Sequence, residues 1–154
     1  MLSTDFKEFL ELLNSTNVEY MVVGGYALAS YGHPRYTGDI DVWVNQTKPN
    51  INKLIDALNA FGFASLGLKE SDFLEYEAVV QLGYPPTRID LLTAIDGVLF
   101  ADCFERKSMA TIDGIDIAVI DIDDFKTNKL AAGRMKDLAD LESLNTDPRH
   151  SAAP

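Results

Sequence analysis

Two aspartates separated by a single residue, Asp39 and Asp41, are the feature of this sequence best suited to chemistry. Residues 39–44 alternate acidic and apolar side chains, which is the period of a β-strand, so the two carboxylates should project from one face. Adjacent carboxylates repel one another and attract a divalent cation, and oxygen is the ligand atom that Mg²⁺ prefers. The pair therefore indicates a metal site, although an edge strand with solvated acids would have the same pattern.

A third acid, Asp90, lies in an apolar segment at residues 88–92 that is also predicted to be a strand. A carboxylate among apolar neighbours is costly to bury unless a cation pairs with it. A metal ion shared with the first two aspartates would meet this need. A salt bridge from Asp90 to Arg88 or Arg35 would also meet it, so the sequence leaves both interpretations open.

Polar groups suited to phosphate precede the acidic pair. Gly24 and Gly25 follow an apolar strand at residues 20–23, and backbone N–H groups at a strand-to-helix turn can approach phosphate oxygens closely. A tight turn without a ligand would also use two glycines. Arg35 and Thr37 stand between the glycines and the acids and would add a cation and a hydroxyl to the same site.

The elements that must position these residues can be predicted from hydrophobic periodicity and turn signals. A helix capped by Ser3 or Thr4 begins the chain, Asn50 caps an amphipathic helix, and Asp113-Gly114 predicts a hairpin turn. The other predicted elements are strands at about 20–23, 39–44, 77–82 and 88–92, a short helix at 26–31 and a long helix at about 123–144. This order predicts an α+β fold with a small mixed or antiparallel sheet packed by helices and a long C-terminal helix. We expect one domain, residues 1–144, and a polar tail, residues 145–154.

The predicted C-terminal helix carries cations whose direction follows from its 3.6-residue period. Arg134 falls near the middle of an apolar arc, so it should face the protein, where it can pair with Asp137 or contact phosphate. Lys129 lies off this arc, on the side of Lys136, where a solvated lysine is one expectation. The arc consists of Leu130, Ala131, Leu138 and Leu141.

The composition limits the classes of protein and of partner. The chain has 154 residues, 47% of them hydrophobic, and its single cysteine, Cys103, excludes an internal disulfide and a multi-cysteine zinc site. No apolar run reaches the roughly 20 residues of a membrane span, and the N-terminal segment lacks the basic region of a signal peptide. The net charge of −11 argues against broad, non-specific nucleic-acid binding. We therefore expect a cytoplasmic protein with no membrane partner.

Residues 22–28, Arg35, Thr37 and residues 39–41 together resemble the first motif of the DNA polymerase β-like minimal nucleotidyltransferases. The motif is most similar to that of the AbiEii-type abortive-infection toxins and their bacterial relatives. Asp90 stands where the resemblance places a third carboxylate, and residues 129–141 are similar to the closing helix of those relatives. Many members of the superfamily have Gly-Ser after the first strand, whereas this chain has two glycines, so phosphate binding would depend on backbone amides and nearby cations.

The resemblance implies a nucleotidyltransferase fold that moves a nucleoside monophosphate from a nucleoside triphosphate, such as ATP, to an acceptor hydroxyl. It also implies that Asp39, Asp41 and Asp90 are catalytic and bind Mg²⁺. The nucleotide-binding residues that it implies are Gly24, Gly25, Arg35, Thr37, Lys129 and Arg134.

The identity of the acceptor stays open at this point. The candidates are the 3′ end of a tRNA, a hydroxyl of a partner protein such as a cognate toxin or antitoxin, and a small molecule such as an antibiotic. The resemblance favours a bacterial toxin–antitoxin or phage-defence setting. A non-catalytic module that binds a nucleotide or a partner is the alternative from a different functional class.

Overall fold

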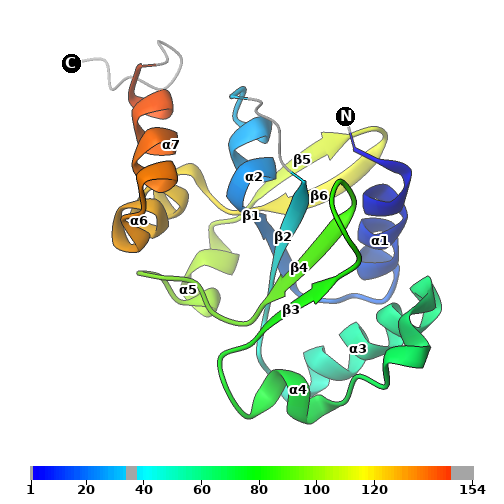
Figure 1. Cartoon of the computed structure of the whole chain (residues 1–154). Coiled ribbons are helices and arrows are strands. Elements are labelled where there is room, and N and C mark those ends of the chain that lie inside the picture. Colours follow the sequence, from blue (N-terminus) through cyan, green and yellow to red (C-terminus); the bar gives the residue numbers. More distant parts are fainter. Residues whose placement is uncertain (1, 34–37, 147–154) are drawn as a thin grey trace.

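The computed structural model of the chain describes residues 2–33 and 38–146. Within these residues, six strands form one sheet in the order β3-β4-β2-β1-β6-β5 (Figure 1). The strands are β1 (Tyr20–Val23), β2 (Asp39–Val44), β3 (Val79–Leu82), β4 (Arg88–Leu92), β5 (Ser108–Ile112) and β6 (Ile115–Val119). Parallel pairs β2–β4 and β1–β6 alternate with antiparallel pairs, so the sheet is mixed, which is one of the two arrangements that the sequence predicts.

Helices cover both faces of this sheet. In Figure 1, α1 and α3 lie on one side and α5, α6 and α7 lie on the other. The helices are α1 (Thr4–Ser15), α2 (Gly24–Ser30), α3 (Lys48–Leu58), η1 (Asn59–Phe63), η2 (Ala64–Leu66), α4 (Glu70–Leu74), α5 (Phe100–Glu105), α6 (Ile122–Ala132) and α7 (Met135–Thr146). The predicted α+β class is therefore confirmed.

The two faces of β2 differ in chemistry because its side chains alternate. Ile40 and Val42 are buried on one face. Trp43 lies on the same face as the two aspartates and makes an edge-to-face contact with Phe100 of α5, with ring centroids 5.2 Å apart. Helix α5 thus covers the Trp43 end of this face.

Local signals predicted several element ends correctly. The Ser3 hydroxyl accepts a hydrogen bond from the backbone N–H of Phe6 and caps α1, as predicted. Asp113 and Gly114 both have positive φ angles, 51° and 83°, at the turn between β5 and β6, which confirms the predicted hairpin.

The predicted cap of α3 is wrong. Thr47 is the N-cap, and its hydroxyl accepts a hydrogen bond from the backbone N–H of Asn50 within the first turn. The buried Asn50 amide instead bonds the backbone of Glu19 and Asn45, which links the start of β1 to the end of β2. Asn50 therefore lies near the start of the helix, but its side chain stabilises tertiary contacts and does not cap the helix.

The helical C-terminal region that the sequence predicts is present and ends in the 12-residue α7. However, the predicted span 123–144 is not one continuous helix, because Gly133 adopts a left-handed conformation with φ of 66° and ends α6. The break changes the direction of the following residues, so the predicted apolar arc does not form one buried stripe. Leu130 and Leu138 are exposed by 68% and 47%.

Cys103 is a free, buried cysteine in α5. Among the described helices, none has both the length and the apolar character needed to cross a bilayer.

Candidate active site

Strand register brings the three predicted carboxylates together. Strands β2 and β4 are parallel neighbours, and Asp41 lies directly beside Asp90 in their register. Because Asp39 is two residues before Asp41, it projects from the same face. One carboxylate oxygen from each of the three residues lies within 4.8 Å of the others. Three hard oxygen ligands at this separation fit a divalent cation such as Mg²⁺.

Arg88 is the fourth member of this group, because it faces Asp39 in the register and lies two residues before Asp90. Its Nε donates to Asp90 Oδ1 at 2.9 Å, and its Nη2 donates to Asp90 Oδ2 at 3.0 Å and to Asp39 Oδ2 at 3.1 Å. The salt bridge from Asp90 to Arg88 that the sequence left open is therefore present. Burial raises the pKa of Asp90, and the hydrogen bonds from Arg88 oppose that rise.

The environment of Asp41 disfavours its charged form. Burial, with further contributions from the negative charges of Asp39 and Asp90, raises its pKa to about 7, although Lys129 and Lys136 act in the opposite direction. A carboxylate with this pKa binds a proton readily when no metal is present. A divalent cation at this site would therefore compete with that proton near neutral pH.

Gly24 allows the close packing of α2 against Asp41. It has a φ of 67°, and a Cβ atom at this position would overlap Asp41 Oδ2. A side chain is therefore excluded both by the backbone conformation and by the carboxylate. Gly24 and Gly25 are buried at the start of α2, which places the predicted glycine pair next to the acids.

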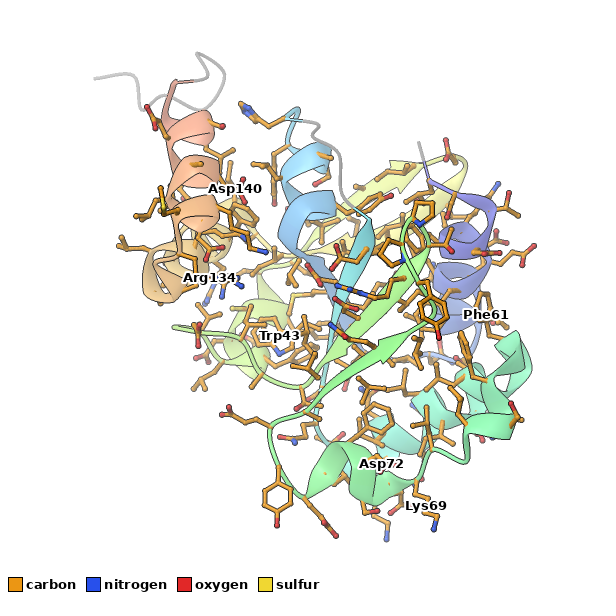
Figure 2. All side chains as sticks on the ribbon, in the orientation of Figure 1. Trp43, Phe61, Lys69, Asp72, Arg134 and Asp140 are labelled. Carbon is orange, nitrogen blue, oxygen red and sulfur yellow. The ribbon has the colours of Figure 1, made fainter. Side chains whose placement is uncertain are left out.

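A cavity of about 520 Å³ connects the acids to a group of cations. The carboxylates and Arg88 line it from the sheet, and Lys129, Arg134 and Lys136 line it from α6, α7 and the turn between them. Figure 2 labels Arg134 at this turn and Asp140 further along α7. Negative and positive charges on opposite walls of one cavity suit a metal-bound phosphate group.

Lys129 is not solvated, which corrects one expectation from the sequence. It is 5% exposed, and its Nζ lies 3.0 Å from Asp137 Oδ1 and 3.5 Å from Asp140 Oδ2. Because Gly133 turns the chain, α7 places both of these carboxylates over α6. Lys129 still borders the cavity, but its charge is balanced by the two aspartates.

Arg134 behaves differently from its prediction in one respect. It pairs with Asp137, with Arg134 Nε 2.7 Å from Asp137 Oδ2, as one of the two sequence interpretations expects. Its side chain is 63% exposed, however, so the expectation that it faces the protein is wrong. The hydrogen bonds from Arg134 and Lys129 outweigh the effect of burial and lower the pKa of Asp137.

The remaining predicted site residues, Arg35 and Thr37, lie outside the described residues. Sequence reasoning did not anticipate Asp140 as a partner of Lys129. The spacing of Asp137 and Asp140, three positions apart on one helix, is a signal that could have indicated a shared cation.

A second cavity, of about 720 Å³, adjoins the first. The two share the segment Ala94, Ile95 and Asp96, which follows β4. The lining of the second cavity includes the acidic residues Glu77, Asp96, Asp102 and Asp124. Asp124 is paired with Arg106 at 2.9 Å, and the other three acids leave this cavity with mainly negative charge.

Comparison with known proteins identifies the fold and the family of the chain. The fold is similar to the crystal structure of a Thermotoga maritima protein that is described as a candidate nucleotidyltransferase. The TM-score is 0.61 at 14% sequence identity, over 90% of this chain and 88% of the other. A comparison with curated protein sequences finds no significant match. Residues 2–146 match the model of a family described as nucleotidyltransferases of unknown function (DUF6036), and the chain therefore belongs to that family.

Proposed function

We propose that this protein is a Mg²⁺-dependent nucleotidyltransferase that moves a nucleoside monophosphate from a nucleoside triphosphate to an acceptor hydroxyl. The observation that carries this proposal is the convergence of Asp39, Asp41 and Asp90 on one face of the sheet, in a chain of a nucleotidyltransferase family. Structural aspartates rarely gather in this way, because their mutual repulsion and desolvation cost free energy.

The three carboxylates would hold Mg²⁺, which supplies Lewis-acid stabilisation of charge on the phosphate oxygens. Asp90, at the β3–β4 side of the group, would accept the proton of the acceptor hydroxyl. The N–H groups of Gly24 and Gly25 at the start of α2 would bind phosphate oxygens next to Asp41.

The cations that line the cavity from α6, α7 and the turn between them would bind the pyrophosphate that leaves the triphosphate. Arg134 and Lys136 are both exposed residues that line the cavity. Lys129 is held between Asp137 and Asp140, so we propose that it contributes mainly by fixing α7 and its cations at the cavity. Arg35 and Thr37 are further proposed phosphate ligands, from the sequence motif alone.

The acceptor would occupy the adjoining acidic cavity next to Asp96. Its acidic lining and the net charge of −11 favour an acceptor hydroxyl on a basic protein over an RNA end. The toxin–antitoxin or phage-defence setting of the similar AbiEii-type proteins would supply such a partner, as a cognate toxin or antitoxin. An RNA 3′ end and a cationic small molecule such as an antibiotic are the other acceptor classes that an experiment must separate.

A non-catalytic binding module is a second candidate function, and one observation favours it. Arg88 already forms ion pairs with Asp39 and Asp90, so these acids have a partner without any metal. Such a module would bind nucleotide without releasing pyrophosphate.

Transfer can be tested with each α-³²P-labelled nucleoside triphosphate, Mg²⁺ and a bacterial cell extract. The products are separated into protein, RNA and small-molecule fractions, and pyrophosphate is measured in parallel. We expect label in one fraction with the wild type and none with Asp39→Asn/Asp41→Asn. The matched control Asp5→Asn/Asp56→Asn removes two exposed helical carboxylates and should retain transfer. Nucleotide binding without label or pyrophosphate would contradict the enzyme proposal and favour the binding module.

A further inference from the structure

Arg88 occupies the space between two of the three carboxylates. Its guanidinium makes three hydrogen bonds of 2.9–3.1 Å, two to Asp90 and one to Asp39. Both oxygens of Asp90 and one oxygen of Asp39 are therefore used by a single cation. Guanidinium–carboxylate bonds of this forked geometry are among the stronger polar interactions in proteins.

The strand register explains why Arg88 lies between the carboxylates of Asp39 and Asp90. Arg88 and Asp90 project from the same face of β4, and Asp39 and Asp41 project from the adjacent face of β2. The four side chains form two neighbouring cross-strand pairs, with Arg88 opposite Asp39 and Asp90 opposite Asp41. The side chain of Arg88 is 29% exposed at the cavity, so it has room to leave the carboxylates without unfolding the sheet.

A metal ion and this guanidinium are both cations that are attracted to the same carboxylates, and their positive charges repel one another at short range. Each carboxylate oxygen keeps a second lone pair, but an ion held by Asp39 and Asp90 would lie beside the guanidinium that now hydrogen-bonds both of them. Among the described residues no cation is ion-paired with Asp41, so that carboxylate is the one still available. The acids thus present one accessible carboxylate and two that are held by Arg88.

We propose that Arg88 competes with the divalent cation for Asp39 and Asp90, so that full metal binding requires Arg88 to release these carboxylates. The inference rests on the metal site of the proposed function. The apparent association constant for metal is then the intrinsic constant multiplied by the fraction of molecules in which Arg88 has released the carboxylates. A purely structural brace would act in the opposite way, because removal of Arg88 would let the carboxylates move apart and weaken metal binding.

The test compares Mn²⁺ affinity in wild type and Arg88→Gln, measured without nucleotide by the electron paramagnetic resonance signal of free Mn²⁺. We expect Arg88→Gln to bind Mn²⁺ about three- to tenfold more tightly than the wild type. Arg106→Gln is the matched control, because Arg106 also makes a forked pair, with Asp124, and its loss changes the net charge equally. Arg106→Gln should change the affinity by less than about twofold, since exposed charges at a distance are screened.

Equal or weaker binding by Arg88→Gln, with clear binding by the wild type, would overturn the competition but leave the proposed metal site intact. Absence of Mn²⁺ binding by both proteins would overturn the metal site and the competition together. A second measurement uses the wild type alone: the Arg88 Nε–H resonance in ¹⁵N spectra should move towards that of a solvated arginine as Mg²⁺ is added. An unchanged resonance at saturating Mg²⁺ would also overturn the proposal.

Discussion

At the scale of single residues, the site is a group of four side chains whose charges depend on one another. Asp39, Asp41 and Asp90 supply three carboxylates within 4.8 Å, and Arg88 supplies one cation. The three negative charges exceed the one positive charge, and the pKa of Asp41 is raised because this carboxylate is half-buried beside two other acids. Its protonation therefore links the stability of the metal-free protein to pH.

The pKa of Asp41 in the folded protein is about 7, whereas its ordinary value is 3.8. The folded state then binds a proton more tightly than the unfolded state, so this group stabilises the protein fully below pH 3.8. That stabilisation is lost as the pH rises through 7. We expect the melting temperature of the metal-free wild type to fall between pH 5.5 and pH 8 more than that of Asp41→Asn, in scanning calorimetry with EDTA. Identical pH profiles of the two proteins would contradict the assigned pKa.

Substitution of Gly24 by alanine should have two effects that can be measured separately, one on the backbone conformation and one on the geometry of the metal site. A left-handed conformation costs about 1–2 kcal/mol for a residue with a Cβ atom, so Gly24→Ala should lower the free energy of unfolding by at least this amount. The new Cβ should also displace the Asp41 carboxylate and reduce Mn²⁺ affinity about tenfold or more.

Gly67→Ala is the matched control for that variant. Gly67 has a similar φ of 64°, but a Cβ there would meet no atom within 4 Å. It should show the same backbone cost in urea unfolding and an unchanged Mn²⁺ affinity. Equal metal affinities of the two variants would argue against contact between Gly24 and Asp41 as a determinant of the site.

At the scale of elements, the turn at Gly133 decides what the cations of α6 and α7 can do. It folds α7 back so that Asp137 and Asp140 meet the buried Lys129. Arg134, at the turn itself, stays exposed while it pairs with Asp137. The cation wall of the cavity is therefore positioned by buried ion pairs rather than by an apolar helix face.

Lys129→Met should destabilise the protein because it leaves Asp140 without this cation and Asp137 with Arg134 alone. The expected loss is about 3–4 kcal/mol in urea unfolding, in the lower part of the range for broken buried ion pairs. Lys53→Met, at an exposed position of α3, is the control and should change stability by less than about 0.5 kcal/mol. A loss of nucleotide affinity without loss of stability would instead favour a direct contact between Lys129 and the triphosphate.

At the scale of the whole molecule, the central strands β1, β2 and β4 carry both the core and the site. One face of β2 packs into the core through Ile40 and Val42, and the other presents the acids. A metal ion bound by Asp39, Asp41 and Asp90 would be held by the central strands of the sheet. Binding to the folded state alone should therefore stabilise the entire domain.

We expect Mg²⁺ to raise the melting temperature of the wild type, by an amount that corresponds to about 2.7 kcal/mol when the ion is a hundredfold above its dissociation constant. Because the net charge is −11, any salt will relieve some repulsion, so NaCl of matched ionic strength is the baseline. Asp39→Asn/Asp41→Asn should show only the effect of ionic strength, and EDTA should reverse the rise in the wild type. An equal response of the variant to Mg²⁺ would place the stabilising ions elsewhere.

Features that depend on neighbouring residues could be predicted from the sequence alone. The period-two pattern at residues 39–44 determined that Asp39 and Asp41 share a face, and Ser3 and Asp113-Gly114 marked a helix start and a hairpin turn. The alternation of a strand, the cap of a helix and the conformation of a turn each depend on a few neighbouring residues, so they can be predicted without the tertiary structure. The motif around these acids also indicated the nucleotidyltransferase superfamily, which family membership and fold similarity support.

Only the tertiary structure decided which long-range partners these residues have. Arg88 and Asp39 are 49 positions apart, and the parallel register of β2 and β4 is what places a guanidinium between two acids. Lys129 is buried because a left-handed residue, Gly133, turns α7 over it, whereas a continuous helix would have left it on an open side. The pairing of β2 with β4 joins segments that are far apart in the sequence, and the burial of Lys129 depends on how α7 packs against α6, so neither could be predicted from neighbouring residues alone.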